Sequence, residues 1–200
     1  MSHRRLLSLA LAALTIPALA VVPNTIAPDF KGTDSNGLEH SLSQYRGKYV
    51  VLEWANKGCP FDQKHYLSGS MENLQKEWTA KGVIWLSVIS SAPGAQGYVT
   101  PAEENEYIKS KHVASTAVLL DPTSTIARLY EAKTTPHMFV IDPTGKLIYQ
   151  GAIDDKPTTE QSDLKGARNY LNETLNAAMA GKPVAVASTR PYGCSVKYAH

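Results

Sequence analysis

The sequence predicts an α/β domain in which a central mixed β-sheet is flanked by helices on both faces, with an N-terminal extension and a C-terminal tail. Two observations lead to this class. Short β-branched runs alternate with amphipathic segments between residues 49 and 130, which is the pattern of parallel strands joined by crossover helices. A hairpin followed by one more helix then closes the chain and adds an antiparallel strand pair.

Composition is that of one ordinary globular domain. The 200 residues are 43% hydrophobic and 19% charged, a balance that supports a single core. Lys and Arg number 20 against 18 for Asp and Glu, which gives a formal net charge of +2. A chain so close to neutrality has no electrostatic reason to bind nucleic acid, and we predict no such partner.

The first twenty residues have the pattern of a secretory signal peptide. Arg4 and Arg5 precede the apolar run from Leu6 to Leu19, and small residues end it at Ala20. We therefore predict a signal peptide over 1–20, a folded domain over 21–182 and a tail over 183–200. The protein is expected to be secreted or periplasmic, with no membrane association after cleavage, in a compartment where cysteines can pair.

The first half of the domain should contain two core strands and two helices. Residues 49–54 and 83–90 are β-branched and aromatic, as in strands covered on both faces. Leu67, Met71 and Trp78 recur at helical spacing and predict one helix over 60–80. Pro101 begins a further helix, with acidic residues in its first turns and lysines in its last.

The second half should supply the hairpin and the last helix. Residues 117–120 are expected to form a strand and 123–130 a short helix. The turn residues 142–145 separate strands at 138–141 and 147–149, which should pair antiparallel. A final helix that ends near Gly181 is predicted from apolar residues that recur on one helical face. These residues are Leu164, Ala167, Leu171, Leu175 and Ala178.

Cys59 stands where the first core strand meets the first helix, with Pro60 after it. The unpaired N–H groups and the positive end of the helix dipole stabilise a thiolate there, and Lys57 and Lys64 add positive charge. We therefore expect a lowered pKa and a nucleophilic thiol. The remaining helix histidines, His65 and His112, are expected to be solvated.

Several separated motifs occur in one order along the chain: Ala27-Pro28-Asp29-Phe30, Ser41 to Lys48, Tyr49 to Leu52, Thr134-Thr135-Pro136 and His137 to Lys146. Together they resemble the thioredoxin fold and within it the redoxin, peroxiredoxin-like branch of the alkyl hydroperoxide reductase and thiol-specific antioxidant superfamily. The resemblance spans roughly residues 24 to 180.

The resemblance implies roles for three further residues. The Thr135–Pro136 bond would be the family's cis-proline and would face Cys59. Glu53 matches the place where thioredoxins carry a buried acid that manages protons for the thiols, and a Glu in a core strand otherwise requires an end that reaches water.

Two departures from the family change the expected chemistry. The thioredoxin Cys-x-x-Cys pair is Cys59-Pro-Phe-Asp62 here, so no second thiol lies in the helix. The peroxiredoxin motif would place Pro at position 52 and Thr at position 56, where this chain has Leu52 and Asn56. The tail motif around Cys194 is similar to the C-terminus of a peroxiredoxin-like subgroup and makes Cys194 the candidate resolving thiol.

The leading hypothesis is a thiol-dependent oxidoreductase in which Cys59 attacks a disulfide or a peroxide and Cys194 resolves the intermediate. Its partners would be that substrate and an external thiol reductant, and no cofactor or metal is expected. One alternative is a redox-silent binding module in which Cys59 and Cys194 form a structural disulfide. Another is a copper-handling protein that uses Cys59 and His137, although His137 and Met138 should point to opposite faces of their strand.

Overall fold

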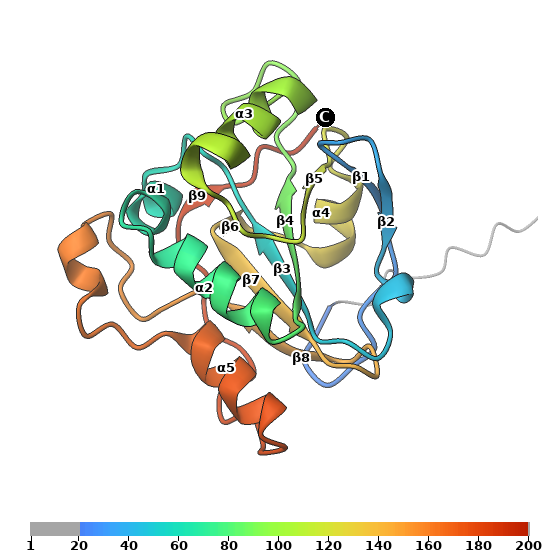
Figure 1. The fold of residues 1–200 in the computed structure, drawn as a ribbon, viewed down its shortest axis with the longest axis vertical. Coiled ribbons are helices and arrows are strands. Elements are labelled where there is room, and N and C mark those ends of the chain that lie inside the picture. The colour runs from blue at the N-terminus through green and yellow to red at the C-terminus, as the bar shows by residue number, and fades with distance from the viewer. Residues whose placement is uncertain (1–20, 200) are drawn as a thin grey trace, which may run out of the picture.

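The computed structural model describes residues 21–199, so the predicted signal peptide lies outside the described residues. A seven-stranded sheet in the order β2-β1-β5-β4-β3-β7-β8 forms the centre of this part of the chain (Figure 1). A two-stranded sheet, β6-β9, lies at one end of it. The strands are β1 (Lys31–Asp34), β2 (Glu39–Ser41), β3 (Val50–Trp54), β4 (Ile84–Ile89), β5 (Ala117–Leu120), β6 (Thr134–Thr135), β7 (His137–Ile141), β8 (Leu147–Gly151) and β9 (Cys194–Ser195).

The sheet is mixed, as the sequence predicts. β3, β4 and β5 run parallel, whereas β7 pairs antiparallel with both β3 and β8. The predicted hairpin is therefore confirmed, with a register shift between Val140 and Ile141. β1 pairs antiparallel with β2 and with β5, and the sequence pattern alone did not predict these two N-terminal strands.

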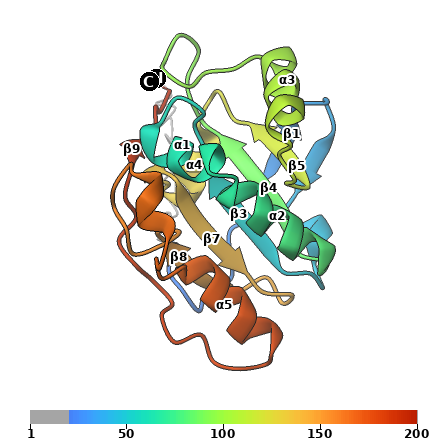
Figure 2. The ribbon, with the colours of Figure 1, turned by 60° about the vertical axis from the view of Figure 1, so that its left-hand side comes forward.

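Helices cover both faces because alternate residues of β3 face opposite sides. Leu52 and Trp54 pack into a cluster with Tyr130 of α4, whereas Val51 packs into a second cluster with Trp78 of α2 and residues of α5. Figure 2 shows α2 and α5 beside the sheet. The helices are α1 (Pro60–Leu67), α2 (Ser70–Ala80), α3 (Pro101–Lys111), α4 (Thr125–Tyr130) and α5 (Tyr170–Met179), with short 3-10 turns at Ser43–Tyr45 and Gln161–Leu164. Within the described residues, no helix is long and apolar enough to cross a membrane.

The single helix predicted over 60–80 is wrong. The chain breaks after α1, where the Ser68 hydroxyl donates to the carbonyl of His65 and Gly69 adopts a φ of 74°. Glycine adopts this left-handed conformation without the steric cost other residues have. As a result Leu67, expected in the buried stripe, is 55% exposed.

The predicted start of the last helix is also too early. Leu164 lies in the 3-10 turn, and α5 begins at Tyr170 because the Asn169 side chain caps the backbone N–H of Asn172. Helix α3 begins at Pro101 as predicted, with a capping box between Thr100 and Glu103.

The C-terminal tail is docked along the molecule. It leaves the end of α5, passes beside α1 and ends near the top of β5 and α4 (Figures 1 and 2). The Thr189 backbone N–H donates to the carbonyl of Gln150 in β8 at 3.1 Å, and its hydroxyl accepts from the backbone N–H of Ala152, just after β8, at 2.9 Å. Further along, the Tyr198 hydroxyl donates to the carbonyl of Ala132 at 2.7 Å. The tail is thus held before and after Cys194.

Candidate active site

Cys59 lies at the junction of β3 and α1, where the sequence places it. It is the N-cap of α1, with Pro60 as the first helical residue. Asn56 holds the preceding turn, because its carbonyl accepts from the Cys59 backbone N–H at 2.9 Å and its side-chain oxygen accepts from that of Gly58 at 2.9 Å. The Cys59 side chain is 0% exposed. The tail therefore has to move before a substrate can reach this sulfur.

The tail brings Cys194 to Cys59. Strand β9 pairs antiparallel with β6, so that Cys194 lies opposite Thr135. The Thr135–Pro136 peptide bond is cis, as the resemblance implied. When protonated, the Cys59 thiol donates to the carbonyl oxygen of Thr135 at 3.0 Å. The site thus gathers Cys59, Thr135, Pro136 and Cys194 from the helix start, the proline loop and the tail.

The two thiols differ sharply in acidity. Burial opposes ionisation of Cys59, but hydrogen bonds from the Cys194 thiol, from Thr135 and from the backbone N–H groups of Asp62 and Cys194 outweigh it, so that its pKa is lowered. For Cys194, burial and the hydrogen bond that it donates to Cys59 raise the pKa to about 11. Cys59 is therefore the more acidic thiol of the pair, and Cys194 is the one that keeps its proton.

The lowered pKa does not come from the lysines that the sequence suggested. The Lys57 ammonium lies 5.9 Å from the centre of the Tyr107 ring, and the Lys64 ammonium lies 3.8 Å from the carboxylate of Asp154. The groups that stabilise the Cys59 thiolate are instead the tail and the first backbone N–H groups of α1.

A buried polar cluster attaches the tail to α1. The Tyr192 hydroxyl donates to Asp154, and the Lys64 ammonium donates to the Tyr192 hydroxyl at 3.3 Å and to the Lys156 carbonyl at 2.6 Å. His65, expected to be solvated, is 1% exposed, and burial lowers its pKa to about 4. Its Nε2 lies 3.7 Å from Asp154. Tyr192 of this cluster lies two residues before Cys194. The cluster therefore fixes the position of the chain that leads into β9.

Glu53 has no end that reaches water. It is fully buried, and both carboxyl oxygens accept hydrogen bonds. Burial raises its pKa in spite of these donors. The donors are the Tyr66 hydroxyl at 2.7 Å, the Trp85 indole N–H at 2.7 Å, the Ser87 hydroxyl at 3.0 Å and the Gln75 amide at 3.1 Å.

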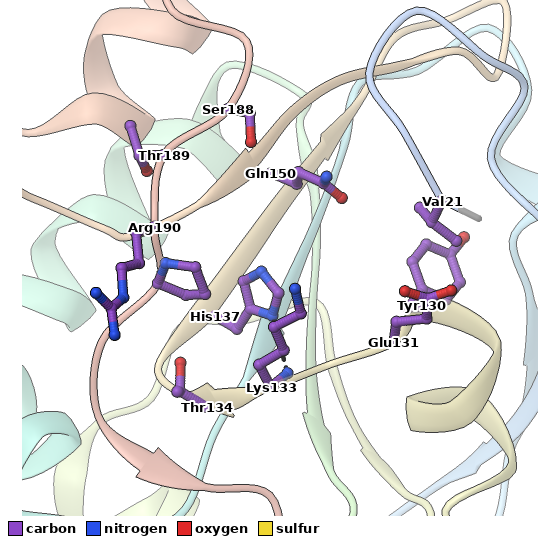
Figure 3. A pocket seen from close by; sticks show the side chains of 11 residues that line it. Val21, Tyr130, Glu131, Lys133, Thr134, His137, Gln150, Ser188, Thr189 and Arg190 are labelled. Carbon is purple, nitrogen blue, oxygen red and sulfur yellow. Dashed lines mark hydrogen bonds between the residues drawn. The ribbon is translucent and has the colours of Figure 1, made fainter.

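His137 faces a different part of the molecule. It points into a pocket of about 650 Å³ between α4, β8 and the tail, beside Lys133 and Gln150 (Figure 3). Its Nδ1 accepts from the Lys133 backbone N–H at 3.2 Å, and burial lowers its pKa to about 3. Cys59 does not line this pocket, and Met138 lies in the core on the opposite face. A copper site made of Cys59 and His137 gains no support; across residues 21–199 no group of three or more His, Cys, Asp or Glu could hold a metal ion.

Known proteins share this fold. Residues 23–150 match the model of the AhpC/TSA family. The chain belongs to the AhpC/TSA family. A thiol-disulfide oxidoreductase, ResA, of Geobacillus kaustophilus is 27% identical over 128 residues, which are 64% of this chain and 68% of the relative.

Two solved structures extend the likeness beyond the AhpC/TSA match. A hypothetical protein of Sinorhizobium meliloti 1021 has a TM-score of 0.71 at 21% identity and covers 90% of this chain and 96% of its own. A putative thiol:disulfide interchange protein, DsbE, of Chlorobium tepidum has a TM-score of 0.52 at 25% identity, over 66% and 85% of the two chains. The fold is thioredoxin-like, and this AhpC/TSA protein is an oxidoreductase enzyme.

Sequence reasoning missed three members of the site. Asp62 is buried beside Cys59, and Asp154 and Tyr192 fasten the tail. Only Asp62 had a local signal, since it stands three residues after Cys59, in the position of the second thioredoxin cysteine. Asp154 and Tyr192 are brought together by the tertiary fold.

Gly193 should be needed for the docked tail. Its φ is 135°, and a Cβ there would lie 2.0 Å from the carbonyl oxygen of Thr135. We expect Gly193→Ala to open the β6–β9 pair at a cost of ~2 kcal/mol, about thirtyfold in the open population. Alkylation of Cys59 by iodoacetamide should accelerate to a similar extent. The control is Gly181→Ala, where φ is also positive but the space is open; equal rates in both variants would contradict the assignment.

Glu53→Gln should change how stability depends on pH. Because burial raises the pKa of Glu53 in the folded state, the folded protein holds this proton more tightly than the unfolded chain. Its contribution is complete below about pH 4.3, the ordinary Glu pKa, and is lost as pH rises towards the raised value. The Gln variant cannot lose the proton, so its unfolding free energy relative to wild type should increase between pH 4 and pH 8 in urea titrations. The exposed Glu77→Gln is the control, and a constant difference for Glu53→Gln would sink the prediction.

Proposed function

We propose that this protein is an exported thiol-disulfide oxidoreductase in which Cys59 is the nucleophile and Cys194 the resolving thiol. One observation carries the proposal: the β6–β9 pair holds Cys194 opposite Thr135, whose carbonyl oxygen lies 3.0 Å from the Cys59 sulfur, and the two thiols so brought together have opposite pKa shifts. Exchange needs one sulfur that is ionised and one that stays protonated until an intermediate has formed. The AhpC/TSA family membership and the similarity to ResA support the same reaction class.

The chemistry follows from this arrangement. The Cys59 thiolate attacks one sulfur of a substrate disulfide, forms a mixed disulfide and releases the first substrate thiol. Cys194, deprotonated, then attacks the Cys59 sulfur and releases the second thiol. The substrate is reduced by two electrons and the Cys59–Cys194 disulfide holds the oxidation, until an external thiol reductant restores both cysteines.

A disulfide fits the site better than a peroxide. Asn56 occupies the position of the threonine in the peroxiredoxin motif, and its side chain is engaged in the turn before Cys59 and with Gln96. Leu52 occupies the position of the motif's proline and is buried in the core. Peroxide turnover is therefore an outcome to be measured beside disulfide turnover.

The tail occupies the place where a substrate would approach the cis-proline. A second pocket, of about 640 Å³, lies on the other side of the tail from the pocket of Figure 3. Both pockets are lined by Thr134, Thr189, Arg190 and Pro191. Lifting the tail segment 189–193 would therefore join them into one groove beside Thr135, whose backbone β9 now pairs. An extended substrate strand can take over that pairing.

Export is part of the proposal. The predicted signal peptide at 1–20 would send the chain to a compartment where disulfides persist. The DsbE-like relative is named as an interchange protein, and a second relative, from Streptococcus pneumoniae, is named as an exposed lipoprotein thioredoxin.

Replacing the two cysteines separately tests their roles. Cys59→Ser should reduce turnover of a dithiol with a small disulfide to the uncatalysed rate, because the only ionised thiol is lost. Cys194→Ser should retain the first attack and accumulate a mixed disulfide at Cys59, visible as an added mass. Turnover that survives in Cys59→Ser would refute the nucleophile, and failure to trap any adduct in Cys194→Ser would refute the resolving role.

Reducibility separates the redox pair from a structural staple. We expect mild dithiol to open the Cys59–Cys194 disulfide in the native protein, so that alkylation and mass spectrometry count two labelled thiols after reduction and none before it. A disulfide that opens only in denaturant would favour the binding-module alternative. The same reaction with hydrogen peroxide as oxidant reports whether Cys59 also reacts with peroxide.

A further inference from the structure

Asp62 is the one carboxyl placed at the start of α1, and nothing in the reaction outlined above uses it. It is 1% exposed. Its Oδ2 accepts from the backbone N–H of Asn56 at 2.5 Å, which fixes the side chain over the turn that carries Cys59. Its Oδ1 is buried without a hydrogen-bond partner. A buried carboxyl oxygen left unpaired is costly, and such groups persist where a reaction uses them.

The neighbours of Asp62 include both thiols. Its backbone N–H donates to Cys59, and its charge acts on Cys59 and on Cys194. Burial raises the pKa of Asp62 well above its ordinary value, and the charges of Cys59 and Glu53 raise it further. The titratable groups that face it are Cys59 on its own helix, Glu53 on β3, Tyr66 on α1, Tyr107 on α3, and Tyr192 and Cys194 on the tail.

We propose that Asp62 is the proton carrier of the Cys59–Cys194 pair and replaces, as an acid and base, the second helix thiol of a Cys-x-x-Cys site. The inference rests on the proposed function. Asp62 stands in the sequence position of that thiol, has one buried carboxyl oxygen without a hydrogen-bond partner, and interacts through its charge with both cysteines.

The proton steps balance without a proton from solvent. In the resting pair Cys59 is a thiolate, Asp62 a carboxylic acid and Cys194 a thiol. When Cys59 attacks the substrate disulfide, the first leaving thiolate takes the proton of Asp62. The resulting carboxylate removes the proton of Cys194, whose thiolate attacks the Cys59 sulfur. The second leaving thiolate then takes that proton from Asp62, which ends as a carboxylate beside the new Cys59–Cys194 disulfide.

Charge repulsion sets the timing of these transfers. While Cys59 is ionised, its negative charge keeps the Asp62 proton in place. Once Cys59 bonds to the substrate sulfur that charge is gone, and Asp62 becomes a stronger acid at the moment when the leaving thiolate needs a proton. Cys194 needs a base more than Cys59 does, since a thiol with a pKa of about 11 is ionised to only about one part in 10⁴ at pH 7.

The test follows resolution by Cys194 directly. Reduced protein is mixed with an aromatic disulfide that releases a coloured thiolate. This weakly basic thiolate does not keep a proton, so in this assay Asp62 gives its proton to water once Cys59 has lost its charge, and the resulting carboxylate is the base for Cys194. The first release reports attack by Cys59 and the second reports attack by Cys194. We expect Asp62→Asn to retain the first release and to slow the second by about ten- to hundredfold at pH 7. In this variant the second rate should rise tenfold per pH unit as hydroxide takes over, whereas wild type should show a plateau.

The matched control is Glu104→Gln, which removes another buried carboxyl that has an unpaired oxygen but lies on α3. Asp62→Ser serves as the second variant if the Asn variant does not fold. A second release in Asp62→Asn with the rate and pH profile of wild type would overturn the inference, as would equal slowing in Glu104→Gln. If wild type itself releases only one thiolate or none, it is the proposed function that fails.

Discussion

The antiparallel contact between β9 and β6 is the interaction on which the rest of the site depends. It places Cys194 opposite Thr135, whose carbonyl oxygen lies 3.0 Å from the Cys59 sulfur, and it leaves Cys59 buried and Cys194 half-buried. The opposite shifts in pKa follow from that contact. Of two adjacent thiols, the one that accepts more hydrogen bonds ionises more easily, and its negative charge then opposes ionisation of the other. In a thioredoxin-type site the helix itself supplies the second thiol. Here a segment 135 residues further along the chain supplies it, and Asp62 is left in the vacated position.

The fold and half of the site could be predicted because their signals are local. Short stretches of sequence are enough to predict the alternating strands and helices, the hairpin, the N-cap position of Cys59 and the proline loop. The signal for a break at Gly69 is also local. However, apolar residues at helical spacing on both sides of a glycine are compatible with one continuous helix and with two helices.

The rest of the site could not be predicted from the sequence, because it depends on contacts between residues that are far apart along the chain. Lys64 and His65 have the positions of surface residues on a helix, yet Asp154 and Tyr192 arrive from other segments and cover them. The sign of the pKa shift at Cys59 was predictable from the helix terminus, whereas its main source, the tail, was not. For the same reason Glu53 could be assigned to the sheet without revealing the four donors that surround it.

The hydrogen bonds that hold the tail on either side of Cys194 give this thiol an advantage over free thiols in solution. With Tyr198 fastened to Ala132 and Thr189 fastened to β8, the segment that carries Cys194 can bow outward without leaving the molecule. A tethered group of this kind keeps an effective concentration in the millimolar range or above. In the proposed reaction, a free thiol in the surroundings would have to exceed that concentration to intercept the mixed disulfide, so each captured substrate would go on to complete reduction.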